Sequence, residues 1–162
     1  ACRIVRVAEG VALDAYALRR EVWRREAGEW LQASDVLFPG YVLVETADPD
    51  QLEKSLRVLA RPAQLVHGAG GAVAALEPQE AALIRRLSAG TRTVGASVGR
   101  IVDGALRVTA GPLTGLEHLV CKIDRHRRAA YLNPSAFCTL TGNPQSARHR
   151  MPRVALEVVS KT

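Results

Sequence analysis

The segment from Val36 to Glu45 constrains the fold of this chain more than any other. It reads VLFPGYVLVE, so Pro39 and Gly40 interrupt an apolar run in its middle. A short, continuous apolar run is typical of a buried strand, and a proline and a glycine inside a strand mark a bulge or a bend. We therefore expect a buried strand that bends at Pro39-Gly40.

The preceding segment has the pattern of a β-hairpin. Val22 and Trp23 come before a polar turn at residues 26–29, which reads EAGE, and Trp30 and Leu31 follow it. Apolar and aromatic residues on both sides of a glycine-containing turn predict two antiparallel strands. We expect the arginines of this hairpin to face solvent or a ligand.

Helices and further strands are predicted around these elements. Asp48 can cap a helix that opens at the next residue, and the periodicity predicts a second helix over 78–87. A helix is also favoured over residues 2–13, and short strands over 64–67 and 73–76. This mixture of elements indicates an α+β chain.

The second half is predicted to be a linker followed by a small β-barrel. Residues 90–104 are rich in Gly, Ser and Thr and have no clear period, which indicates a linker. Short β-type runs separated by turn residues follow, as expected of a small barrel. These runs are 106–110, 119–123, 129–132, 137–140 and 153–159.

The positive charge is concentrated in the barrel segment. Residues 119–162 carry eight basic and two acidic side chains, so the whole net charge of +6 lies there. Arginine supplies most of it, and its planar, multi-donor head suits phosphate contacts and stacking on bases. A polyanion is therefore a plausible partner.

The sequence gives little support to other classes of function. His118, Cys121, His126, Cys138 and His149 do not have the spacing of a structural metal site. No nucleophile–base pair and no phosphate-binding loop is recognisable, so we expect a protein that is not an enzyme and needs no cofactor or metal. The absence of a secretory signal and of a long apolar run predicts a cytoplasmic protein without a membrane partner.

Two motifs resemble those of the NusG family. VLFPGYVLVET resembles the signature of the NusG N-terminal (NGN) domain, and RVTAGPLTGLEHLVCKIDRHRRAAYL resembles a KOW motif. Their order agrees with the family and the resemblance covers nearly the whole chain. The segments GPLTGLE, KIDRHRR and REVWRREAGEW are closest to the LoaP branch of specialised antitermination paralogues.

The resemblance implies an α+β protein with an NGN-type α/β sandwich over residues 1–89. In it, helices cover an antiparallel sheet. A linker over 90–104 and a small SH3-like KOW β-barrel over 105–162 would follow. The function implied is transcription elongation or antitermination by a monomer that docks on the clamp region of RNA polymerase.

The NGN domain of the family docks through the surface around its LFPGY element. The matching residues here are Leu37, Phe38, Pro39, Gly40 and Tyr41. The alternative is that Phe38 and Tyr41 only fill the core of the sheet. Gly40 is expected to have a backbone role in permitting the bend.

The KOW resemblance implies a turn and a basic surface. Gly111, Pro112 and Gly115 are expected to shape the turn. LoaP-like barrels imply contact with structured nascent RNA, here through Lys122, Arg125, His126, Arg127, Arg128, Arg148, His149 and Arg150. One alternative is a solvated basic face that binds nothing in particular. Another is a barrel that binds a protein partner, a ribosomal protein or the Rho termination factor, as in housekeeping NusG.

Two features depart from the family pattern. The family begins with a Trp-Tyr-apolar strand, whereas Ala1 to Val11 resembles its first helix. We therefore expect the first strand of the family to be missing, which would follow if the N-terminal end of this sequence were truncated. Residues 133–150 are also longer and richer in turn residues than the final hairpin of the family.

Overall fold

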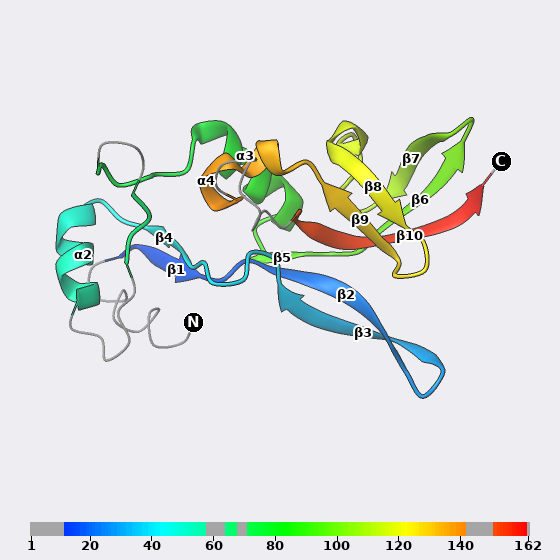
Figure 1. Ribbon diagram of the computed structural model, residues 1–162, viewed down its shortest axis with the longest axis horizontal. Coiled ribbons are helices and arrows are strands. Elements are labelled where there is room, and N and C mark those ends of the chain that lie inside the picture. The colour runs from blue at the N-terminus through cyan, green and yellow to red at the C-terminus, as the bar shows by residue number, and fades with distance from the viewer. Residues whose placement is uncertain (1–11, 58–63, 68–70, 142–150, 162) are drawn as a thin grey trace. The chain divides into compact units, whose positions relative to one another are not determined.

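The computed structural model describes residues 12–57, 64–67, 71–141 and 151–161 of the chain. The chain divides into two compact units: Ala1–Ala17 with Gly40–Leu76, and Leu18–Pro39 with Glu77–Thr162. Helices and several sheets are present, so the α+β class is confirmed (Figure 1). The hairpin segment thus belongs to the same unit as the basic C-terminal segment.

The first unit is built from a two-stranded sheet and one helix. Strand β1 (Asp14–Tyr16) pairs antiparallel with β4 (Leu43–Glu45). Helix α2 (Pro49–Arg57) buries Leu52 and Leu56. The Asp48 carboxylate accepts a hydrogen bond from the Gln51 amide at 2.9 Å, so the predicted cap is confirmed.

The second unit contains the predicted hairpin. Strand β2 (Arg19–Glu26) pairs antiparallel with β3 (Glu29–Val36) over their whole length, and the chain turns at Ala27 and Gly28, which both have positive φ. On its other side β2 pairs in parallel with the short β5 (Thr93–Val94). The three strands form one sheet in the order β3-β2-β5.

Helix α3 (Pro78–Ser88) confirms the predicted second helix. A capping box between Glu77 and Glu80 begins it, and Ala89, in the left-handed region, ends it. Ile84 and Leu87 lie on its buried side. The Glu80 carboxylate also accepts hydrogen bonds from the amide and hydroxyl of Thr139, which fixes α3 to a later segment.

A curled five-stranded sheet makes up the rest of the second unit (Figure 1). Its strands follow one another in the order β7-β6-β10-β9-β8, and all neighbours pair antiparallel except β6 and β10. The strands are β6 (Ser97–Val102), β7 (Ala105–Ala110), β8 (Val120–Asp124), β9 (Ala129–Leu132) and β10 (Arg153–Lys161). Strand predictions over 106–110, 119–123, 129–132 and 153–159 are thereby confirmed.

The core of this unit contains side chains of the curled sheet and of the segments that connect its strands. Leu113, Leu132, Phe137, Val154 and Leu156 are almost completely buried. Burial of large aliphatic and aromatic side chains such as these is the main stabilising term, at about 1.5–3 kcal/mol each. The core thus positions β9, β10, the turn after β7 that contains Leu113, and the segment after β9 that contains Phe137.

Two segments differ from the sequence prediction. Residues 137–140 are not a strand: the 3₁₀ turn η2 (Pro134–Phe137) leads into the short helix α4 (Cys138–Thr141). The Asn133 side chain accepts a hydrogen bond from the Ser135 amide and begins this turn. The predicted strands over 64–67 and 73–76 are reduced to a single bridge between His67 and Val73.

The linker predicted over 90–104 is also corrected, because it contains β5 and β6. The glycines of this segment permit close approach between strands as well as turns of the chain. A Cβ on Gly99 would lie 2.9 Å from the Arg107 carbonyl oxygen of the paired strand β7. The helix predicted over residues 2–13 lies almost wholly outside the described residues.

Candidate nucleic-acid interface

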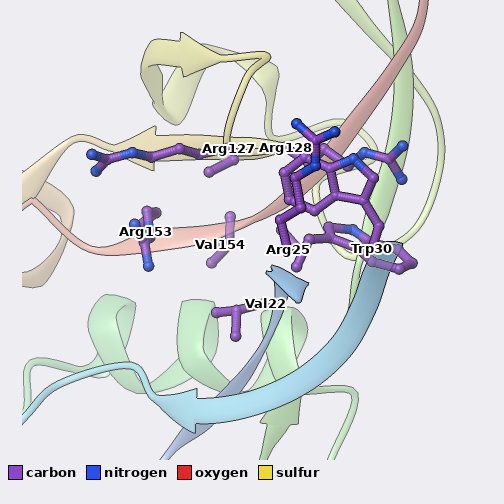
Figure 2. A pocket seen from close by; sticks show the side chains of 10 residues that line it. Val22, Arg25, Trp30, Arg127, Arg128, Arg153 and Val154 are labelled. Carbon is purple, nitrogen blue, oxygen red and sulfur yellow. The ribbon is translucent and has the colours of Figure 1, made fainter. Parts of the chain in front are cut away.

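A cavity of about 220 Å³ lies in the second unit between the hairpin and strands β9 and β10 (Figure 2). The ten lining residues are Val22, Trp23, Arg25, Trp30, Arg127, Arg128, Ala129, Arg153, Val154 and Ala155. Among these ten lining residues, four are arginines, two are tryptophans and none is acidic. The cavity therefore offers positive charge together with flat aromatic surfaces.

The hairpin places three of these side chains on one face. Successive strand residues point to opposite faces, so Trp23 and Arg25 share a face of β2. Arg25 is directly opposite Trp30 in the register, which puts Trp30 on that face too. Gly28, at φ +90°, permits the tight turn that holds this register.

Arg128 lies against both tryptophans. Its guanidinium carbon is 5.4 Å from the centroid of the Trp23 ring and 4.8 Å from that of Trp30. Both distances are typical of cation–π contacts. Glu157 on β10 forms an ion pair with Arg128 at 3.2 Å, and the Leu156 amide donates to the Arg128 carbonyl. This arginine is thus fixed at the edge of the cavity.

A buried arginine joins the hairpin to β10. Arg20, 8% exposed, donates one hydrogen bond to Asp35 at 3.0 Å and another to the Arg153 carbonyl. Burial lowers the pKa of Arg20, whereas the hydrogen bond from Arg20 lowers the pKa of Asp35. The contact holds the wall of the cavity that carries Arg153.

Two buried donors in the described part of the chain have no hydrogen-bond partner. They are Arg20 Nε and Trp23 Nε1. An unsatisfied buried donor costs about 1–3 kcal/mol, so such groups are rare and call for an explanation. The Trp23 indole is the more informative of the two because it belongs to the cavity lining.

The structure brings only part of the predicted RNA-binding set to the cavity. Arg127 and Arg128 line it. Arg125 and His126 are exposed in the turn between β8 and β9, and Lys122 is exposed on β8 with its ammonium 5.6 Å from the Tyr131 ring centroid. The predicted residues Arg148, His149 and Arg150 lie outside the described residues.

The five residues predicted to dock on polymerase occupy different environments. Leu37 and Phe38 are 4% and 6% exposed, and the Phe38 ring lies 5.4 Å from that of Phe137. Phe38 is therefore a core residue of the second unit. Pro39 and Gly40 are exposed, Tyr41 is half-buried, and Gly40 has positive φ at +93°. The buried strand predicted over 36–45 is wrong: β3 ends at Val36, residues 37–42 belong to no strand, and the short β4 contains no buried residue.

The three residues predicted to shape a turn lie in the turn that follows β7. Gly111 has φ +97°, and a Cβ there would lie 2.5 Å from the Ala96 carbonyl oxygen. Gly115 also has positive φ, and Pro112 lies in the turn between them. Leu113 is completely buried, so the turn is fixed to the core.

Sequence reasoning missed Trp23, Arg25, Trp30 and Arg153 as site residues. A signal for three of them was present, because the only two tryptophans of the chain flank one turn and Arg25 shares their face in the predicted register. Arg153 could not be found in this way. Its place beside the hairpin depends on a contact between segments far apart in the sequence.

No three His, Cys, Asp or Glu side chains lie together as a possible metal site within the ranges that the structure describes. No described helix is long and apolar enough to cross a membrane. Models of known protein families do not match this chain, and neither do curated protein sequences. The geometry of the cavity is therefore the main guide to function.

Proposed function

We propose that this chain is a transcription elongation and antitermination factor of the NusG type that contacts nascent RNA. The observation that carries the proposal is the cavity of the second unit, where four arginines and both tryptophans of the chain meet. Such a protein acts by binding, in the bacterial cytoplasm, without catalysis or a cofactor.

The chemistry of the cavity favours single-stranded nucleic acid over other polyanions, and the resemblance to RNA-binding KOW barrels makes RNA the nucleic acid proposed. Proteins bind single-stranded nucleic acid by combining a positively charged groove with aromatic rings on which bases stack. Arginine also stacks on bases through its guanidinium plane. A site that only neutralised charge would not need two tryptophans beside the arginines.

The role in transcription is supported by the two motifs and their order. The curled sheet and the buried turn at Gly111 and Leu113 are compatible with a KOW-type barrel. The bend at Gly40 agrees with the NGN-like motif. In this proposal Leu37 and Phe38 support the polymerase-binding surface from the core, and exposed Pro39 belongs to the surface itself.

A binding experiment tests the RNA part of the proposal. The full chain is mixed with the transcribed leader of the genes next to its own, and complexes are separated on a native gel over a salt series. We expect binding that weakens steeply between about 50 and 200 mM salt. Absent or salt-insensitive binding would contradict RNA recognition and favour a protein partner.

A transcription assay tests the proposed role in antitermination. Purified RNA polymerase transcribes a template that carries this leader and a downstream terminator, with and without the full chain. We expect more full-length transcript in its presence. The control variant Arg100→Ala, at an exposed position on β6 that does not line the cavity, should retain the effect. Unchanged termination with the wild-type chain would refute the antitermination role.

A further inference from the structure

We propose that the cavity between the β2–β3 hairpin and strands β9 and β10 takes up a single unpaired RNA base. The arginines at its rim would hold the phosphates on either side of that base. This inference rests on the proposed RNA binding and gives it a definite site. It also adds the two tryptophans to the basic residues that the sequence predicted for RNA binding.

The size of the cavity fits one flat ring system. Its volume of about 220 Å³ is below the ~300–1,000 Å³ of pockets that enclose drug-sized ligands. A whole nucleotide cofactor or a folded peptide segment would not fit inside it. An extended strand could still leave one base in the cavity and keep its backbone outside.

The walls offer surfaces on which a base can stack. The Arg128 guanidinium carbon lies 4.8 Å from the Trp30 ring centroid, so these two groups already contact each other. A base would stack against the cavity side of this pair and not between the two groups. Val22, Ala129 and Val154 supply small apolar contacts. Bases stack on aromatic rings and on guanidinium planes because each presents a flat, polarisable face.

The Trp23 ring is a second aromatic surface of the cavity lining. Its Nε1 atom is buried and has no hydrogen-bond partner in the described part of the chain, so it is not exposed to a ligand in the cavity. We therefore expect a base to stack against the aromatic lining without a hydrogen bond from this indole.

The charges around the cavity suit the phosphates of a strand. In the view of Figure 2, Arg127 and Arg153 lie to the left, whereas Arg25, Arg128 and Trp30 lie to the right. Cations at both ends of a base site can contact the phosphates before and after the base. A neutral aromatic ligand would leave these arginines unused.

The experiment uses tryptophan fluorescence of the full chain. Because the chain has only two tryptophans and both line the cavity, the emission reports on this site alone. One ligand is a single-stranded oligoribonucleotide of mixed sequence, about ten nucleotides long. The other is an oligomer of abasic ribose phosphates with the same length and charge.

We expect the oligoribonucleotide to quench the emission saturably and to bind roughly 5- to 150-fold more tightly than the abasic oligomer. Equal binding of the two ligands without quenching would overturn the base site and leave phosphate-driven RNA binding intact. Binding of neither ligand would contradict the base site and the proposed RNA function together.

A pair of variants supports the assignment independently. Trp30→Leu removes one stacking surface and should abolish most of the preference for the ligand with bases. Leu31→Ala, at the neighbouring exposed position on the other face of β3, should retain the preference. An equal loss of this preference in both variants would show that it depends on the fold of the hairpin and not on the Trp30 ring.

Discussion

The salt dependence of RNA binding should fall when Arg25 and Arg153 are replaced by alanine. These two arginines are chosen because the others at the cavity already have acidic neighbours. Arg128 pairs with Glu157 at 3.2 Å, and Arg127 lies 3.8 Å from Asp124. Among the described residues, Arg25 and Arg153 have no such pair, which leaves their charge available to phosphates.

The expected size of the change follows from counterion release. Each phosphate that is neutralised on a single strand contributes about −0.7 to the slope of log K against log salt concentration. Loss of two contacts should therefore make the slope shallower by about 1.4. Between about 50 and 200 mM salt this amounts to a roughly sevenfold smaller loss of affinity than in the wild type.

Fluorescence anisotropy of a labelled RNA, titrated with the full chain at several salt concentrations, measures this slope. The control variant replaces Arg24 and Arg100, which are exposed and lie outside the cavity lining, and lowers the net charge equally. Its slope should stay close to that of the wild type. Equal changes in both variants would refute a localised phosphate site and indicate a general charge effect.

Three further predictions concern the framework of the site. Gly111→Ala should destabilise the chain by at least about 1 kcal/mol more than Gly104→Ala in thermal unfolding. Both glycines have positive φ, but only at Gly111 would the new Cβ lie 2.5 Å from a backbone carbonyl. Glu80→Ala should cost about 1–3 kcal/mol by the same measurement, because it removes the carboxylate that joins α3 to α4. Because Arg20 lowers the pKa of Asp35, the ion pair stabilises the fold above pH 3.8, and this stabilisation is lost as the pH falls through the lowered pKa. Asp35→Asn should therefore flatten the curve of melting temperature against pH in that acidic range.

Local patterns predicted much of the fold. The hairpin around Gly28 and the helix capped by Asp48 depend on signals that lie within a few residues of each other. The segment 90–104 could not be assigned in the same way. Its strand β6 is defined by pairing with β7 and β10, and its glycine content, which suggested a linker, permits that close pairing.

The candidate site was only partly predictable for the same reason. The excess of arginine after residue 119 pointed to a polyanion, and Arg127 and Arg128 do line the cavity. The stacking of Arg128 on Trp23 and Trp30 joins segments about a hundred residues apart. Nothing in the local sequence indicates that contact, so only the structure shows that the tryptophans of the hairpin and the arginines after residue 119 share one site.

The central claim is that RNA binds at the cavity of the second unit. Its most direct test is the ¹H–¹⁵N spectrum of the full chain during titration with single-stranded RNA, because the two indole N–H signals belong to Trp23 and Trp30 and to no other residue. We predict that both signals shift saturably at the concentrations where RNA binds. Unchanged indole signals in the presence of bound RNA would contradict the claim.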